Sequence, residues 1–299
     1  MSVPSASSPV PVTDLGSRAP PRKGRRLRAF ARNPTFVAGI VILAFFVLLA
    51  LFADILCPGD PQDMVAQPLL WPGQDAQFPL GTDSLGRDVL SNLVHGARAS
   101  LLVGVAAAAI GLAIGMVVGA LAGFFGGRTD MLLMRLVELF QTTPTFLLVV
   151  VIVAIRAPSL QTIALAIGLA SWPTVARLVR AQFRSLREAD FVMAARSLGY
   201  SSTRIIVQEI LPNALPPVIV AASVMIANAI LTEAGLSFLN MRDPNVVSWG
   251  GMIGDGRDQL RTAWFLTALP GATIAFAVLS LNLVGDGLNE ILNPRSDDP

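Results

Sequence analysis

Six long apolar stretches alternate with polar segments along the chain. They are Thr35–Ala53, Ala99–Gly127, Leu139–Ile155, Ala157–Ala176, Ile210–Thr232 and Thr262–Gly285. None contains a charged residue. A helix needs about 17–25 mostly apolar residues to cross a bilayer, and each stretch is long enough for one crossing. Kinks are expected at five prolines inside them: Pro144, Pro173, Pro216, Pro217 and Pro270. The pattern predicts an all-α polytopic membrane protein with six transmembrane helices.

A polar, arginine-bearing segment, residues 190–212, separates the fourth and fifth stretches. Its charges exclude it from the bilayer interior. Its apolar residues recur three or four positions apart, as on one face of a short helix: Phe191, Ala194, Ala195 and Leu198. Gly199 is typical of the residue that ends a helix. Residues 201–203 are good N-caps for a second helix, and Leu211-Pro212 is expected to end or kink that second helix. We therefore predict a helix–Gly–helix elbow outside the membrane.

Composition supports the membrane assignment and excludes several kinds of chemistry. The chain is 53% hydrophobic and 14% charged, against about 25% charged residues in soluble domains. One Cys and one His leave too few ligands for a zinc site, so no metal site is expected. The only lysine, Lys23, lies in the N-terminal tail, and a nucleotide-binding P-loop needs a lysine after its glycines. We expect no catalytic residue, no cofactor and no nucleic-acid partner.

Charge also predicts the orientation of the chain. Most arginines fall in the tail, between the second and third stretches, and from the end of the fourth stretch through the elbow, while the first loop is acidic. Because basic residues concentrate on the cytoplasmic side, we expect both termini and the elbow to be cytoplasmic. The first stretch is too long for a signal-peptide core, so it is interpreted as an uncleaved span.

These features give a domain plan. It comprises a disordered basic tail at 1–34, a first transmembrane helix at 35–56, an extracytoplasmic loop at 57–97, a five-helix core at 98–292 with the loop 190–212, and a tail at 293–299.

Three sets of residues near the spans have local interpretations. Glycines four apart, which allow close helix packing, serve contacts within the chain or between subunits: Gly111, Gly115, Gly119 and Gly123. One helix face carries arginines that suit lipid headgroups or an acidic partner: Arg177, Arg180, Arg184 and Arg187. Glu138 is expected to pair with Arg135, and Glu233 and Asp286, near span ends, suit packing or capping as well as function.

The elbow resembles a known sequence element. Met193-Ala194-Ala195, Gly199 and Leu211-Pro212 are similar to the "EAA" loop of the inner-membrane permeases of ATP-binding-cassette importers. In that family the loop is a coupling helix that docks on a cytoplasmic ATPase. The resemblance assigns coupling to Asp190, Met193, Ala194, Ala195, Arg196, Gly199, Leu211 and Pro212. Met193 stands where glutamate is usual.

Further motifs narrow the resemblance to C-type peptide and nickel permeases, which are type I importer permeases. PLGTDSLGRDVLS at 79–91 and GARASL at 96–101 resemble the subfamily's outer loop and second span. GLSFL at 235–239, SWG at 248–250, GDGL at 285–288 and NPR at 293–295 resemble its C-terminal third. The subfamily's usual Gly-Leu and Pro-Pro pattern is replaced by NMRDPN at 240–245.

The resemblance implies a prokaryotic inner-membrane complex that imports dipeptides or oligopeptides. Its partners would be a sister permease, membrane lipids, two ATPase domains that bind ATP and Mg, and an extracytoplasmic binding protein. The implied docking residues for the binding protein are Asp83, Arg87, Asp88 and Trp249. Nickel is the alternative cargo, a proton-coupled secondary transporter is an alternative mechanism, and a non-transport scaffold or receptor is a third possibility.

Overall fold

The computed structural model describes residues 33–292, so most of the predicted 1–34 tail and the whole 293–299 tail lie outside the described part. The described chain is helical, with two isolated bridges in the first loop. Its elements are α2 (Pro34–Leu51), α3 (Ala53–Leu56), α4 (Val89–Phe125), α5 (Gly127–Gln141), α6 (Thr145–Ile155), α7 (Leu160–Leu186), α8 (Asp190–Ser197), α9 (Ser202–Arg204), a π-helical turn (Ile205–Ile210), α10 (Leu211–Phe238), α11 (Trp249–Gly256), a 3-10 turn (Arg257–Gln259) and α12 (Phe265–Leu292).

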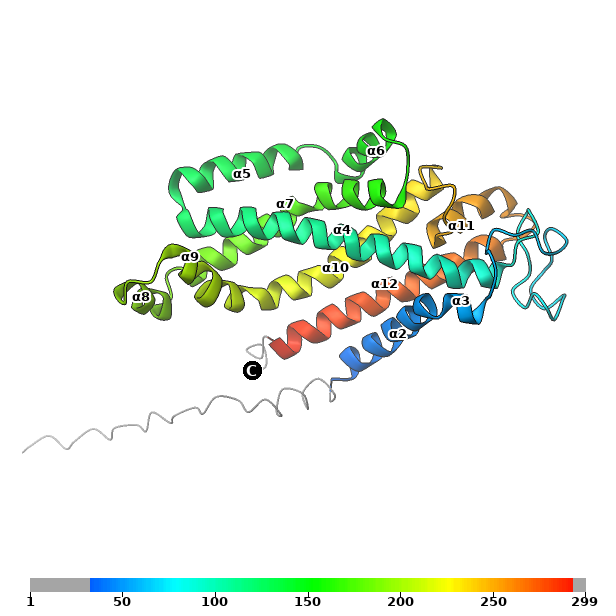
Figure 1. The fold of residues 1–299 in the computed structure, drawn as a ribbon, viewed down its shortest axis with the longest axis horizontal. Helices are drawn as coiled ribbons and strands as arrows, with labels where there is room; N and C mark the ends of the chain where they lie inside the picture. Colours follow the sequence, from blue (N-terminus) through cyan, green and yellow to red (C-terminus); the bar gives the residue numbers. More distant parts are fainter. Residues whose placement is uncertain (1–32, 293–299) are drawn as a thin grey trace, which may run out of the picture.

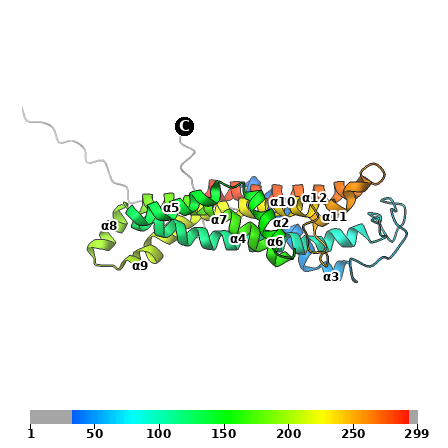
Figure 2. The same cartoon turned by 90° about the horizontal axis from the view of Figure 1, so that it is seen from above.

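The long helices lie side by side in an elongated bundle (Figures 1 and 2). Five of the described helices are long and apolar enough to cross a membrane, and the count is six if the bent pair α5–α6 is one span. The short helices α8 and α9 lie at one end of the bundle. Helix α11 and the loop between α3 and α4 lie at the other end. The two ends are called here the elbow end and the platform end.

The third span differs from its prediction. The sequence pattern predicts one helix over Leu139–Ile155, whereas the structure has α5 and α6 bent by 78° across a short break. The break lies at residues 142–144. Pro144 supplies no backbone N–H and disfavours helical geometry at the residue before it. The other prolines predicted to kink spans lie inside continuous helices.

The helices also extend beyond the charge-free stretches. Helix α4 begins at Val89 instead of Ala99, α7 continues to Leu186, and α12 continues to Leu292. A window that stops at the first charged residue misses these ends. On α4 and α7 that residue is an arginine, which can keep its aliphatic stem on the helix and its guanidinium in water, and on α12 it is Asp286. The spans are therefore longer than their apolar cores.

The glycine ridge of α4 lies against α7. A Cβ on Gly115 would come within 2.5 Å of Val175 Cβ, and one on Gly119 within 2.5 Å of the Ala176 carbonyl oxygen. Gly111 and Gly123 face Ser171 and Phe183 of the same helix. All four glycines are thus used within one chain, where the missing side chains let the two backbones approach closely.

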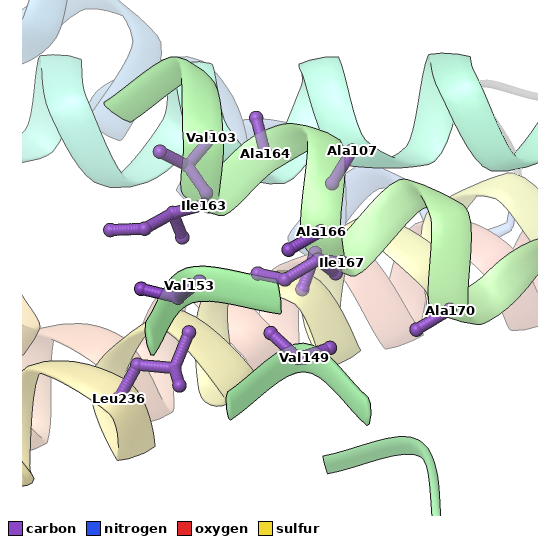
Figure 3. Close-up of a cluster of buried hydrophobic side chains, with 11 residues drawn as sticks. Val103, Ala107, Val149, Val153, Ile163, Ala164, Ala166, Ile167, Ala170 and Leu236 are labelled. Carbon is purple, nitrogen blue, oxygen red and sulfur yellow. The ribbon is translucent and has the colours of Figure 1, made fainter. Parts of the chain in front are cut away.

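One buried cluster joins four helices near the platform half of the bundle (Figure 3). Val103 and Ala107 of α4 and Val149 and Val153 of α6 lie around the segment Ile163–Ala170 of α7, with Leu236 of α10. The cluster fixes the short helix α6 to the longer spans.

Candidate functional site: the elbow and the platform

Helix α8 ends in a Schellman motif at Gly199. The Tyr200 amide donates to Ala195 O at 3.1 Å, and the Gly199 amide donates to Arg196 O at 2.9 Å. Gly199 has φ of 77°, a region where only glycine is unstrained. The Ser201 hydroxyl then accepts a bond from the Arg204 amide and caps α9. The elbow is therefore a defined turn, built by the residues that the sequence pattern singles out.

The buried face of α8 differs from the predicted one. Val192 and Ala195 are buried, whereas Phe191 and Leu198 are exposed, Leu198 at 73%. Ala194 and Met193 are exposed as well. Of the predicted face only Ala195 is buried, and Val192 joins it in the contact with the bundle. Four of the predicted coupling residues on α8 are exposed: Asp190, Met193, Ala194 and Arg196.

Arginines at the end of α7, just before the elbow, fix that helix to the helices that precede it. Both guanidinium nitrogens Nε and Nη2 of Arg180 donate to Asp130 of α5, the latter at 2.6 Å. Arg187 Nη1 donates to Phe124 O, at the end of α4, at 3.2 Å. The arginine row of α7 therefore serves contacts within the chain at these two positions. Arg135 and Glu138 form the predicted local pair, at 3.0 Å.

The connection from the elbow to α10 is continuous. The prediction that the helix could end at Leu211-Pro212 is wrong, because Ser202–Phe238 runs as one helix. The π-helical turn immediately precedes Pro212, and the Leu211 amide bonds to Ile206 O. A wider turn absorbs the backbone change that a proline imposes. The second helix of the elbow thus continues into a candidate membrane span without a break.

At the platform end, the carboxylates of the 79–91 motif form hydrogen bonds with backbone amides of their own loop and of the start of α4. Asp83 Oδ1 accepts bonds from the Leu85 amide at 2.8 Å and the Arg87 amide at 2.9 Å. Asp88 caps α4 through the amides of Leu90 and Ser91. These carboxylates hold the loop together, whatever further contact they make with a partner.

Trp249 requires a correction to the predicted docking set. Its side chain is fully buried, its Nε1 donates to Leu93 O at 2.9 Å, and its ring packs edge-on against Phe46 at 5.5 Å between centroids. A side chain in this position packs α11 against α4 and α2, and it is not accessible to a docked protein.

Glu233 joins α10 to α11, which sequence reasoning did not anticipate. Its side chain is 1% exposed, and Oε1 accepts bonds from Ser237 Oγ at 2.8 Å and Ser248 Oγ at 2.7 Å. Ser248 in turn caps α11 by accepting from the Gly251 amide. The available sequence signal was a carboxylate at the edge of an apolar stretch, which did not indicate its partners.

Comparison with protein-family models shows which family the chain belongs to. The model for "Binding-protein-dependent transport system inner membrane component" matches residues 115–298. The chain belongs to that family. A second model, the N-terminal TM domain of oligopeptide transport permease C, matches residues 24–76. The chain is accordingly a multi-pass transport permease component.

Relatives named as peptide transport permeases align over most of the chain. The di/tripeptide transport system permease protein of Pseudomonas aeruginosa is 40% identical, covering 90% of each chain. The dipeptide transport system permease protein of Escherichia coli K12 is 38% identical, covering 97% of this chain and 96% of its own.

Solved structures of permease complexes share the fold at low identity. An inward-facing methionine transporter, MetNI, aligns with TM-score 0.55 at 19% identity, covering 67% of this chain and 96% of its own. An amino acid transporter crystallised with histidines aligns with TM-score 0.52 at 16% identity, covering 66% of this chain. The helical arrangement is therefore shared with a chain of each of these ABC transporters.

Proposed function

We propose that this chain is one of two permease subunits of an ATP-driven peptide importer in a prokaryotic inner membrane. Family membership and the peptide-transporting relatives support this function. Their names favour peptides over nickel as the cargo. The partners in the proposal are a sister permease, two ATPase domains that hold ATP and Mg, and an extracytoplasmic binding protein.

The exposed elbow is the observation that carries the coupling role. It presents Phe191, Met193 and Leu198 to solvent at the end of the bundle opposite α11 (Figure 1). An apolar surface on a rigid turn suits insertion into a groove of another protein. In this proposal the elbow faces the cytoplasm, and closure of the ATPases moves it together with α10.

Motion of α10 would then reach the platform through Glu233. The carboxylate is bonded to Ser248 at the start of α11, so the outer end of α10 and α11 move as one body. We propose that the binding protein delivers a peptide at this end, while the acidic loop contributes to its docking through Asp83, Arg87 and Asp88.

Purification of the tagged chain in mild detergent, followed by reconstitution, tests the proposal. We expect a second permease and ATPase subunits to copurify, and ATP with the binding protein to drive uptake of a labelled dipeptide. Uptake that persists without the ATPases and collapses with a protonophore would overturn it in favour of a secondary transporter.

A further inference from the structure

A cavity of about 460 Å³ lies between α6, α7 and α10. Its base is shared with the buried cluster of Figure 3, through Val149, Ile167 and Ala170. The lining residues of α7 fall near the middle of that helix, between Ile167 and Thr174. The cavity is therefore placed well inside the membrane-spanning part of the bundle.

The break in the third span lies beside this cavity. Thr145, the first residue of α6, lines the cavity, and the exposed residues Thr142 and Thr143 form the break just before it. Irregular backbone at membrane depth is tolerated only inside protein or along a water-filled path. The broken span therefore indicates that this face does not contact lipid tails.

Uncharged polar groups gather on the same wall. They are Thr145, Ser171, Thr174, Asn228 and Thr232. Asn228 is exposed, and Thr232 donates its hydroxyl proton to Asn228 O at 2.7 Å, which leaves the hydroxyl oxygen free to accept. The lining of this cavity includes no charged side chain. Exposed amides and hydroxyls in the middle of a span are costly against lipid and suit a hydrated path.

We propose that this wall, centred on Asn228 and Thr232, is this subunit's part of the peptide-binding surface in the translocation path. The inference rests on the proposed function and assigns the surface to particular residues. Its groups donate and accept hydrogen bonds as a peptide backbone requires, and none of them selects for side-chain charge. The path therefore recognises the amide backbone and passes peptides of either charge.

The test introduces a charge into the wall of the complete transporter. Asn228→Asp, reconstituted in proteoliposomes with the sister permease, ATPases and binding protein, is assayed with a cationic and an anionic tripeptide. We expect the ratio of cationic to anionic uptake to rise roughly fivefold or more over wild type, because a carboxylate in a partly dehydrated path attracts one and repels the other. The binding protein is the same in both preparations, so its own preference cancels.

A matched pair of hydroxyl deletions covers the case in which the charged variant does not assemble. Thr232 Oγ1 donates to the carbonyl four residues earlier at 2.7 Å, and Thr273 Oγ1 on α12 does the same at 2.9 Å. Thr232→Val is expected to lower uptake at subsaturating peptide relative to Thr273→Val, which lies outside the cavity lining.

An unchanged charge ratio in an active Asn228→Asp transporter, or equal uptake by the two threonine variants, would overturn the assignment. If instead wild-type proteoliposomes show no ATP-dependent peptide uptake, the proposed function itself fails. The two failures are thus distinguished by the wild-type measurement.

Discussion

Gly199 and Asn240 have backbone φ angles of 77° and 61°, and each follows a helix. Gly199 ends α8 at the elbow, and Asn240 follows α10 at the platform, where its amide donates to Ser237 O at 3.0 Å. Left-handed backbone costs a β-carbon residue about 1–2 kcal/mol, with asparagine among the better tolerated. Both turns therefore depend on the identity of one residue.

Gly199→Val is predicted to weaken coupling without a steric clash. No atom lies within 4 Å of a Cβ built at this position, so the cost comes from the φ angle alone, about 1–2 kcal/mol. In the assembled transporter we expect fewer peptides imported per ATP hydrolysed. Gly199→Asn is the control and should retain most of the coupling. Normal coupling in the valine variant would contradict the role of the turn.

Asn240→Val is predicted to destabilise the platform end, because a β-branched residue is disfavoured at positive φ. We expect a lower thermal midpoint in detergent, which corresponds to a loss of about 1 kcal/mol in the free energy of unfolding. Asn240→Gly, which removes the Cβ at this positive φ, should equal or exceed wild type. A valine variant as stable as the glycine variant would show that this φ angle is not maintained in solution.

Among the elements, the pair α4–α7 is the most closely fitted. A methyl group at Gly119 would meet backbone atoms of α7, which cannot rotate away as a side chain can. The glycine ridge in the sequence indicated close packing of α4, but not its partner helix. That partner depends on how the whole bundle assembles, which a local motif does not encode.

Gly119→Ala should therefore separate α4 from α7 and lower the thermal midpoint of the purified protein. Gly271→Ala in α12 is the matched control, since nothing lies within 4 Å of a Cβ there. In the control, removing a helical glycine should leave stability unchanged or raise it by about 0.5–1 kcal/mol. Equal midpoints for the two variants would mean that α4 and α7 do not approach so closely.

Apolar stretches located every span, but their ends and internal irregularities followed other rules. Span ends continue through arginines, as α7 does beyond Ala176. The proline at 144 breaks its span, whereas Pro173 and Pro270 do not. A proline inside a span is accommodated when neighbouring helices hold both halves in line. A sequence stretch does not show which helices will pack beside it. The sequence alone therefore could not distinguish the proline that breaks its span from the prolines that do not.

At the scale of the whole molecule, the elbow and the first loop lie at opposite ends (Figure 2). The elbow motif was predictable because its glycine and caps act locally. The contacts at the platform end were less predictable. Trp249 is buried, and Glu233 accepts hydrogen bonds from serines four and fifteen residues away. Apart from the Ser237 bond inside α10, those contacts arise from tertiary packing of α11 and the residue before it on α10, α4 and α2.

Cys57, the only cysteine of the chain, tests the orientation. Burial raises the pKa of its thiol, and the Asp88 carboxylate adds to the rise. Because the thiolate is the reactive form, alkylation by a membrane-impermeant maleimide should be slow near neutral pH and faster at higher pH. We expect labelling of intact cells, from outside.

Met193→Cys in a Cys57→Ser background is the matched probe, since Met193 is 51% exposed on the elbow. This variant should react only after the membrane is permeabilised. Labelling of the elbow in intact cells would reverse the proposed orientation.

Helix α4 has 37 residues, which at 1.5 Å per residue is about 55 Å of rod. The hydrocarbon core of a bilayer is about 30 Å thick, so α4 is longer than that core, and its first turns lead directly into the first loop. Asp88 caps this helix. In the proposed orientation, a protein docking from outside would meet a surface whose height above the hydrocarbon core is set by the length of α4 and not by the thickness of the bilayer.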